Sequence, residues 1–593
     1  MEMGREKRPS GSGTGLSDET LACVLKYVES AEDRASVSLV CKQWRLVDGA
    51  TRKFVTIAYM YSTSPEMLTR RFKRLEGLKL KGKPRAAEYD LLVPDWGGYA
   101  EPWIRDLGRA YTSLQTLQLR RCQVSNADLT LIASSPCQAS LQVLYLHKCA
   151  GFSTAGLLPV AKSCRSLKSL SVEDSDVTDE GGEWLFELAR NNSVLEVLNF
   201  AVLGLEDVDA ADLVLLVERC KSLVSLKVGE VEMVDMISAI SRASSLTEFG
   251  TGSCNFFGDE DSRTHVSISL PSSLTGLSGL WAMSDPGLAM VLPIAPNLRK
   301  LDLKFTLLSR KAYCQLFSQC HALEELQVRN AVGDEGMEVI GKTCKSLRRL
   351  RVEHDNAGAI TQRGVVAVAQ GCARMQQLIV YVSDITNAAL AMLGQCCAQL
   401  TDFRLVLETA ARRVVDLPLD DGIKLLLKGC RKISKLAVYL RHGGLTDRGM
   451  GYIGEFGTNL KWLLLGCTGE SDIGLASLAY KAQRIERLEC RDCPFGEAGL
   501  AAAVVAMSSL KFIWIQGYRA PWAGEHLLAL SRPYLNIEVI SSTDTQPGQL
   551  IAHYTTVGPR TDNPLEVKQL TLNPDDHLQE MRPSLHSPGS TRH

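Results

Sequence analysis

The chain has 593 residues, a formal net charge of −1 and 45% hydrophobic residues. This apolar content is typical of a folded protein and excludes a chain that is disordered throughout. A net charge near zero argues against a general nucleic-acid-binding protein, so we expect no nucleic-acid partner.

The N-terminal residues 1–15 are polar and charged, and they contain no apolar stretch typical of a secretory signal. The longest apolar runs, such as Leu500–Met507, are too short to span a bilayer. We therefore expect a disordered tail over 1–15, no membrane partner, and a location in the nucleus and cytoplasm, where thiols stay reduced.

Residues 16–57 differ in pattern from the rest of the chain. Leu16–Glu19 is typical of a capped helix start, and apolar residues then recur at helical spacing, which predicts three helices. The stretch SLVCKQW at Ser38–Trp44 resembles an F-box. That resemblance implies docking on the Skp adaptor of a cullin-based ubiquitin ligase through Leu16, Leu39, Val40, Cys41 and Trp44. The alternative is a helical cap that closes the end of a repeat array.

A repeat of the form C-x-x-L-x-x-L-x-L occupies most of residues 58–540, and Cys344–Glu353 shows it clearly. The period of about 26 residues is that of leucine-rich repeats. The pattern predicts an α/β fold in which parallel strands line the inside of a right-handed horseshoe and helices cover the outside. Several of the 18 cysteines share one repeat position, which favours small buried side chains over a metal site: Cys164, Cys220, Cys320, Cys344, Cys372, Cys397 and Cys430.

Insertions interrupt the repeats at 81–113, 263–271, 353–364 and 408–421. Loops on one edge of a repeat array commonly lie on the binding side, and we expect 81–113, 353–364 and 408–421 to border a ligand pocket. Residues 541–593 are polar and rich in Pro, Thr and His, and we expect them to be disordered.

The strand positions that face away from the repeat core carry many cations. Arg351 and Arg404 occupy the same register two repeats apart, with Ile379 between them. Tyr381 and Tyr439 add aromatic surface. This face is either a solvated basic surface or a pocket in which converging cations and apolar walls hold a small organic anion.

Several motifs at these positions resemble one family. KGKPRAA at Lys81–Ala87, WGGY at Trp96–Tyr99, VYVSDIT at Val380–Thr386, DFRLVL at Asp402–Leu407 and QGYRA at Gln516–Ala520 are similar to the coronatine-insensitive proteins, the plant jasmonate receptors. The resemblance runs from the F-box to about Val539. The auxin receptors share the architecture and a related loop, but carry His where this chain has Arg85.

The resemblance implies a jasmonate-type oxylipin as ligand, an inositol polyphosphate as co-ligand, and the degron of a jasmonate-ZIM-domain repressor as partner. The implied oxylipin-binding residues are Arg85, Ala86, Tyr89, Leu91, Arg351, Ile379, Tyr381, Arg404, Tyr439, Leu464, Arg491 and Trp514. The implied phosphate-binding residues are Lys79, Lys81, Arg120, Arg121, Arg349, Arg404, Lys435 and Arg487.

Two departures from the family pattern bear on the ligands. Ile379 stands where flowering-plant members have Ala, so we expect a smaller cavity and a ligand smaller than jasmonoyl-isoleucine, such as dinor-12-oxo-phytodienoic acid. Gln118 and Tyr145 replace a His and a Lys that help to bind phosphate, which implies a weaker or shifted polyphosphate site.

Other functions remain open at this point. A hormone-independent F-box protein could use the basic face to bind a phosphorylated degron. A horseshoe scaffold without a ligase role is a further alternative. The sequence places no nucleophile, metal cluster or paired carboxylates at matched strand positions, so we expect a non-catalytic substrate adaptor.

Overall fold

The computed structural model describes residues 16–90, 92–93, 95–201, 205, 208–229, 231–250, 252, 254, 268–354, 360–408, 416–519, 536–541, 549–555, 560–562 and 568–570. The expectations for residues 1–15 and for Leu91 lie outside this part of the chain.

The N-terminal module consists of three helices: α1 (Asp18–Leu25), α2 (Ala31–Val40) and α3 (Lys42–Thr51). Ser17 and Ser30 cap α1 and α2, since each hydroxyl accepts a hydrogen bond from a backbone N–H of the first turn. Leu21 and Leu25 of α1 pack on Val47 of α3 and form a small separate core. The three-helix prediction is confirmed.

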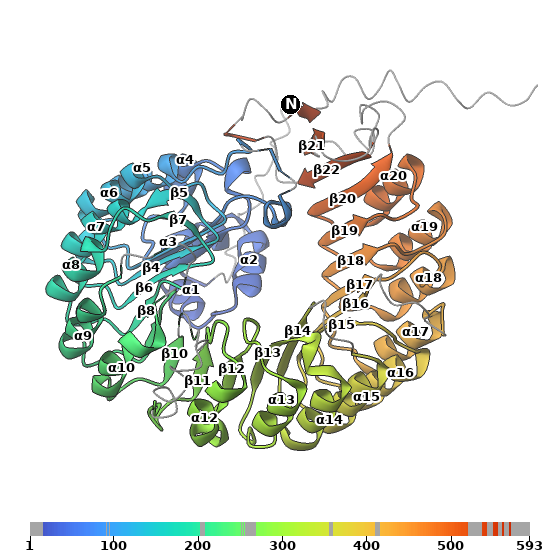
Figure 1. Cartoon of the computed structure of the whole chain (residues 1–593). Helices are drawn as coiled ribbons and strands as arrows, with labels where there is room; N and C mark the ends of the chain where they lie inside the picture. Colours follow the sequence, from blue (N-terminus) through green and yellow to red (C-terminus); the bar gives the residue numbers. More distant parts are fainter. Residues whose placement is uncertain are drawn as a thin grey trace, which may run out of the picture.

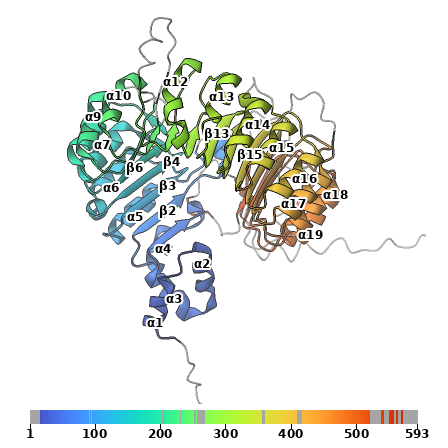
Figure 2. The same cartoon turned by 90° about the horizontal axis from the view of Figure 1, so that it is seen from below.

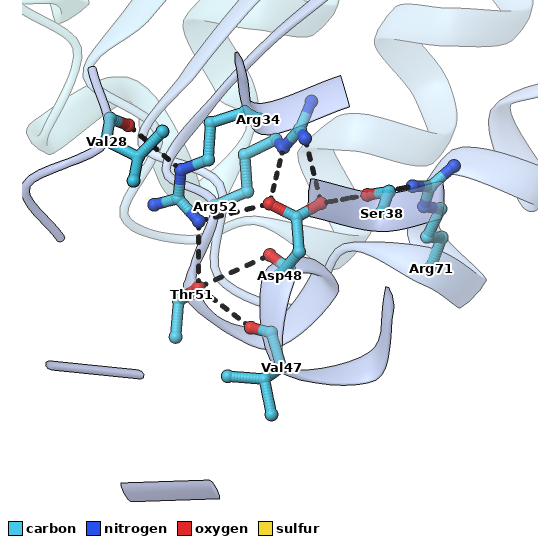
Figure 3. Close-up of polar contacts among 8 residues, drawn as sticks. All are labelled: Val28, Arg34, Ser38, Val47, Asp48, Thr51, Arg52 and Arg71. Carbon is cyan, nitrogen blue, oxygen red and sulfur yellow. Dashed lines mark hydrogen bonds and ion pairs between the residues drawn. The ribbon is translucent and has the colours of Figure 1, made fainter. Parts of the chain in front are cut away.

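A buried carboxylate connects this module to the repeats (Figure 3). Asp48 is fully buried and forms ion pairs with Arg34 at 3.0 Å and Arg52 at 2.8 Å. Ser38 donates a hydrogen bond to Asp48 at 2.6 Å, and Arg71, from the first helix after the module, donates to Ser38 at 2.9 Å. A buried carboxylate needs such partners to offset its desolvation. These contacts orient the helical module on the first repeat.

The remainder forms a horseshoe (Figure 1). Its inner wall is one sheet in which successive strands pair in parallel, in chain order. The strands are β1 (Phe54–Ile57), β2 (Gly77–Lys81), β3 (Thr116–Arg120), β4 (Val143–His147), β6 (Ser169–Glu173), β8 (Val197–Asn199), β9 (Ser225–Lys227), β10 (Glu248–Gly250), β11 (Gly276–Ser278), β12 (Lys300–Asp302), β13 (Glu325–Arg329), β14 (Arg349–Glu353), β15 (Gln377–Val382), β16 (Asp402–Leu407), β17 (Lys435–Tyr439), β18 (Trp462–Gly466), β19 (Arg487–Arg491) and β20 (Phe512–Arg519). Two short strands, β5 (Ala150–Ser153) and β7 (Asp176–Thr178), pair separately.

Helices cover the outer face of this sheet, and the N-terminal module projects from one side of the horseshoe (Figures 1 and 2). The helices are α4 (Pro65–Arg71), α5 (Glu101–Ala110), α6 (Asn126–Ser134), α7 (Thr154–Ser163), α8 (Glu183–Asn191), α9 (Ala210–Arg219), α10 (Met233–Arg242), α12 (Leu288–Val291), α13 (Arg310–Phe317), α14 (Gly333–Thr343), α15 (Gln362–Gly371), α16 (Asn387–Cys396), α17 (Asp420–Gly429), α18 (Asp447–Phe456), α19 (Asp472–Lys481) and α20 (Glu497–Ala506). The predicted architecture is confirmed.

The repeat leucines explain why the array holds together. Leu350 and Val352 of β14 are fully buried, and Leu350 lies in register with Leu326 and Leu378 of the neighbouring strands. Each turn thus covers the apolar row of the turn before it, which is how a solenoid builds its core. The seven cysteines of the shared repeat position are all buried free thiols, as expected.

Three details correct the predicted boundaries. Phe54–Ile57 is the first strand of the solenoid sheet and not part of the helical module, because it pairs with Gly77–Leu80. The insertion 81–113 contains a regular element, α5, whose second residue is Pro102; in the first turn of a helix the missing N–H of proline costs nothing. Asn536–Ser541, at the end of the range 58–540 expected to hold repeats, is β21 and pairs antiparallel with β22 and β23.

The C-terminal segment is also more ordered than its composition predicts. The strands β22 (Gln549–Thr555) and β23 (Lys568–Leu570) continue the sheet beyond β20 in antiparallel pairing. The stretch Leu550–Tyr554 is mostly apolar and suits a strand, which the average composition of residues 541–593 conceals. For these residues the expectation of disorder is wrong.

Candidate functional site

A cavity of about 1410 Å³ lies inside the horseshoe. Strands of its N-terminal and C-terminal halves, which we call its two limbs, border the cavity. Its volume exceeds the ~300–1,000 Å³ of pockets for one small molecule, so it has room for more than one ligand. The cationic side chains that line it are Lys81, Lys83, Arg85, Arg120, Arg121, Lys148, Lys227, Lys300, Lys304, Arg351, Arg404, Lys435 and Arg487. Fewer carboxylates do so, namely Glu88, Glu173, Asp174, Asp176, Glu248, Asp302, Glu325, Glu353 and Glu489.

Most of the predicted phosphate-binding residues meet in this cavity. Lys81, Arg120 and Arg121 come from the end of β2 and from β3, while Arg404, Lys435 and Arg487 come from β16, β17 and β19 across the opening. Lys79 and Arg349 do not line it. Lys79 lies two residues before Lys81 on β2, and Arg349 is exposed and paired with Glu325 at 3.3 Å.

Crowding has an electrostatic consequence for these cations. Burial, and then the charge of Arg120, lowers the pKa values of Lys79 and Arg121, and burial, then Lys79 and then Arg120 lower that of Lys81. The Nε of Arg120 is buried and has no hydrogen-bond partner among the described residues. A set of cations that disfavour one another's charge is stabilised by a bound anion.

A second cluster joins the 81–113 loop to the last strands. Arg85 begins a short 3₁₀ turn, η2 (Arg85–Tyr89), and its Nη2 donates a hydrogen bond to the Tyr89 hydroxyl at 2.9 Å. The Arg491 guanidinium lies 4.6 Å from the centre of the Tyr89 ring and 4.2 Å from that of Trp514. Ala86 is buried in the same apolar group as Trp514. Five predicted oxylipin-binding residues are therefore neighbours.

Glu489 connects the two clusters, and sequence reasoning missed it as a site residue. Its side chain is 0% exposed; Trp462 Nε1 donates to it at 2.8 Å and Arg487 Nε at 2.9 Å. Arg491 lies 3.6 Å away on the other side. Glu489 was identified only as partial charge balance on the inner face. The available signal was its place between two arginines in the motif RLECR.

Trp462 was also missed. Its ring lies under two predicted site arginines, 4.8 Å from Arg404 and 5.9 Å from Arg85, and it packs with Leu464 and Tyr439. Because an indole attracts guanidinium groups, Trp462 forms a wall between the two clusters.

The register predicted for β14 to β16 is confirmed. Ile379 pairs with Arg351 on one side and Arg404 on the other, and it is 8% exposed. The repulsion expected between the two arginines is offset locally, since Glu353 lies 2.8 Å from Arg351 and Asp402 accepts two hydrogen bonds of 2.9 Å from Arg404.

The two predicted tyrosines lie on the same inner wall. Burial raises the pKa of Tyr381, with a further contribution from nearby Tyr89, while Arg351 opposes it. Tyr439 donates a hydrogen bond to Asp492 at 3.1 Å, and burial raises its pKa as well. Both phenols therefore remain neutral donors near neutral pH.

The helical module presents apolar side chains to solvent. Leu39 is 86% exposed, and Leu16, Val40 and Cys41 are exposed as well, whereas Trp44 packs partly on the module's own core. Tyr27 and Leu46 are also exposed and were not predicted. An exposed apolar patch of this kind is typical of a docking face.

Among the described residues, no group of three His, Cys, Asp or Glu could hold a metal ion. Within the same residues no helix combines the length and hydropathy that crossing a membrane requires.

Comparison with known proteins assigns both parts of the chain. An F-box model matches residues 13–54, a "Transport inhibitor response 1 protein domain" model matches 73–119, and a leucine-rich-repeat model matches 163–185. Coronatine-insensitive protein homolog 1a of Oryza sativa is 44% identical over 93% of this chain and 95% of its own length. The chain belongs to the coronatine-insensitive protein family.

Other relatives agree with this assignment. Coronatine-insensitive protein 1 of Arabidopsis thaliana is 40% identical over 95% of this chain and 98% of its own length, and GRR1-like protein 1 of the same plant is 34% identical over 96% and 99%. This coronatine-insensitive family member is a substrate-recognition F-box subunit of an SCF-type ubiquitin ligase and has no catalytic role of its own.

Proposed function

We propose that this protein is an oxylipin co-receptor: a jasmonate-type acid binds at the Arg85–Arg491 cluster and completes a surface for a repressor degron. The observation that carries the proposal is Arg491. Its guanidinium stands between the rings of Tyr89 and Trp514, and its buried Nε and Nη2 have no hydrogen-bond partner among the described residues. Glu489 lies 3.6 Å from Nη2, which is an ion pair but too long for a hydrogen bond. A ligand oxygen would supply the missing hydrogen bonds, and leaving a buried donor without one costs about 1–3 kcal/mol.

The two ends of the ligand would meet different chemistry. Arg85, Arg351 and Arg404 offer guanidinium groups that suit a carboxylate in bidentate geometry. Tyr381 offers a neutral hydroxyl for an amide or ketone oxygen, whereas Tyr439 would have to exchange its hydrogen bond to Asp492 for one to the ligand. The other walls are apolar: Ala86, Tyr89, Ile379, Leu464 and Trp514.

An inositol polyphosphate is the proposed co-ligand of the basic cavity. Lys81, Arg120 and Arg121 face Arg487 across it, and burial together with their mutual repulsion lowers the pKa values of Lys81 and Arg121. Tyr145 does not add to this set, because its hydroxyl donates to Glu173 at 2.7 Å. The co-ligand would connect both limbs of the horseshoe.

The proposed protein partners follow from the two faces. The exposed patch around Leu39 would bind the Skp adaptor and, through it, the cullin. The degron of a jasmonate-ZIM-domain repressor would bind over the oxylipin. Because a repressor acts in the nucleus, we propose that the protein acts there as well as in the cytoplasm.

Ile379 favours a small ligand. It lies between Arg351 and Arg404 and occupies volume that an alanine would leave free. Overfilling a tight site costs about 1–3 kcal/mol, so we expect dinor-12-oxo-phytodienoic acid to promote degron binding better than jasmonoyl-isoleucine. Ile379→Ala should reverse this order in calorimetric titrations, and an unchanged preference for the isoleucine conjugate would contradict the assignment.

The main experiment measures capture of a repressor degron peptide by the complex of this protein with the Skp adaptor, with and without oxylipin. Arg491→Ala should weaken oxylipin-dependent capture by roughly 30-fold or more, the effect of about 2 kcal/mol. Arg363→Ala on α15 is the matched control, because this arginine is exposed and pairs with Glu338 at the surface. Equal capture without oxylipin would overturn the proposal.

A second candidate function is favoured by the cavity itself. Its many cations could bind a phosphorylated degron directly, with no hormone. Capture that depends on peptide phosphorylation and ignores oxylipin would support this alternative.

A further inference from the structure

Three residues near the C-terminus lie against the beginning of the solenoid. Thr561 N donates to the carbonyl oxygen of Tyr61 at 2.7 Å, and Asp562 accepts a hydrogen bond from the backbone N–H of Gly98 at 3.0 Å. Arg560 Nη2 donates to the carbonyl oxygen of Trp96 at 2.5 Å. We name Arg560, Thr561 and Asp562 the C-terminal clasp. It joins parts of the chain that are more than 450 residues apart.

Arg560 is the centre of the clasp. Its side chain is 0% exposed, and its guanidinium lies 4.0 Å from the Trp96 ring and 5.3 Å from the Tyr61 ring. Asp562 neutralises it through hydrogen bonds of 2.8 and 3.0 Å. A buried arginine that is stacked, hydrogen-bonded and paired is held in one geometry.

Gly97 shows how closely the clasp approaches the loop. Its φ of +94° is one that L side chains rarely adopt, and an added Cβ would lie 2.5 Å from Asp562 Oδ2 and 2.6 Å from Arg560 Nη2. The two glycines of the WGGY motif thus permit a turn whose backbone contacts the clasp directly.

The clasp reaches the proposed ligand site through one continuous apolar group. Tyr61 and Trp96, which the clasp holds, belong to the same buried cluster as Ala86, Phe512 and Trp514. Ala86 and Trp514 are walls of the proposed oxylipin pocket, and Tyr61 and Trp96 meet edge to face at 4.9 Å. Movement of Trp96 would therefore displace the floor on which the loop carrying Arg85 and Tyr89 rests.

We propose that the C-terminal clasp is a positioning element that fixes the 81–113 loop in its binding conformation and closes the horseshoe by joining its first and last repeats. The residues of the clasp touch no ligand in this proposal. The step from loop position to ligand affinity rests on the proposed function, whereas the step from clasp to loop does not.

The first test needs no ligand. Hydrogen exchange is measured in the full chain bound to the Skp adaptor, for peptides covering 95–101. Arg560→Ala and the near-isosteric Asp562→Asn should each accelerate exchange at Gly98 by at least tenfold. Asp562→Asn removes the carboxylate that accepts the Gly98 N–H, and Arg560→Ala removes the arginine that holds this carboxylate in place. Arg363→Ala should leave it unchanged. Unchanged exchange in both clasp variants would overturn the proposal.

The second test adds the ligand. Both clasp variants should lower oxylipin-dependent capture of the degron peptide at least tenfold, while co-purification with the Skp adaptor stays as in the unmodified chain. Faster exchange with undiminished capture would show that the clasp does not position the ligand loop. Absence of oxylipin-dependent capture in the unmodified chain would instead count against the proposed function and leave the exchange result valid.

Discussion

The strands β6–β12 and β14–β20 of the horseshoe share one repeat but differ in what they present to the cavity. From β6 to β12 the inward positions are mostly small or polar, such as Ser171, Asn199, Gly250 and Ser278. From β14 to β20 the same positions carry large cationic and aromatic side chains: Arg351, Tyr381, Arg404, Tyr439, Trp462, Arg487, Arg491, Phe512 and Trp514. Both limbs bury the same leucine rows. Repeat residues that face the helices therefore determine the fold, and those that face the cavity are free to specify a site.

The sharpest way to break this division is to mutate two adjacent residues of one strand. Leu350→Ala removes a fully buried side chain and should lower the free energy of unfolding by about 2–5 kcal/mol. Arg351→Ala, at a half-exposed position, should change it by less than about 0.5 kcal/mol but reduce oxylipin-dependent degron capture by about tenfold or more. Denaturant unfolding and peptide capture measure the two effects. A large stability loss in Arg351→Ala would mean that the inward positions also hold the fold.

A change at Glu489 tests whether the basic cavity and the Arg85–Arg491 cluster are linked. Glu489→Gln keeps the shape but removes the charge that Arg487 and Arg491 share, at a cost of about 1–3 kcal/mol. We expect weaker binding of both inositol hexakisphosphate and oxylipin, each measured alone by calorimetry. The control is Asp421→Asn, which removes an exposed carboxylate that is paired with Arg448 on the outer face. Loss of only one ligand would show that the clusters act separately.

The basic cavity also predicts a pH dependence. Burial and then Arg120 lower the pKa of His147, and burial and then Lys79 lower that of Lys81. A bound polyanion raises both pKa values, so binding takes up protons and affinity falls as pH rises through the lowered values. Calorimetry of inositol hexakisphosphate in two buffers of different ionisation enthalpy should show a net uptake of protons on binding. His147→Gln should reduce this uptake, because one of the two groups is removed, and proton release on binding would contradict the assignment.

Sequence periodicity was sufficient for the fold and for part of the site. Because neighbouring repeats pair without a register shift, the position of Ile379 between Arg351 and Arg404 could be read from the pattern. The burial of Glu489 could not, since the pattern assigns inward positions to solvent and only the surrounding side chains enclose it.

Contacts distant in sequence escaped prediction for a different reason. The clasp pairs Arg560 with Trp96, and no periodic signal connects a polar C-terminal segment to a loop of the first repeat. The positive φ of Arg121, +52°, which directs its Nε to the carbonyl of Lys83, is likewise set by the turn after β3 and not by residue type.

The smallest expected effect is that of Lys300→Gln, and it tests whether specific side chains or the overall positive potential of the cavity bind the polyphosphate. Lys300 on β12 and Arg487 on β19 are both inward-facing cations that line the cavity, at the first position of their strands. Lys300 is exposed and pairs with Glu248 at 2.6 Å, and surface pairs contribute about 0–1 kcal/mol. Lys300→Gln should therefore change the free energy of unfolding by less than about 0.5 kcal/mol and inositol hexakisphosphate affinity by less than about twofold. Arg487→Gln, which removes a guanidinium held by buried Glu489 and stacked 4.3 Å over Phe512, should weaken that affinity by about tenfold. Calorimetry of both variants separates the two cases, since equal losses would mean that net positive potential, rather than the placement of particular groups, binds the anion.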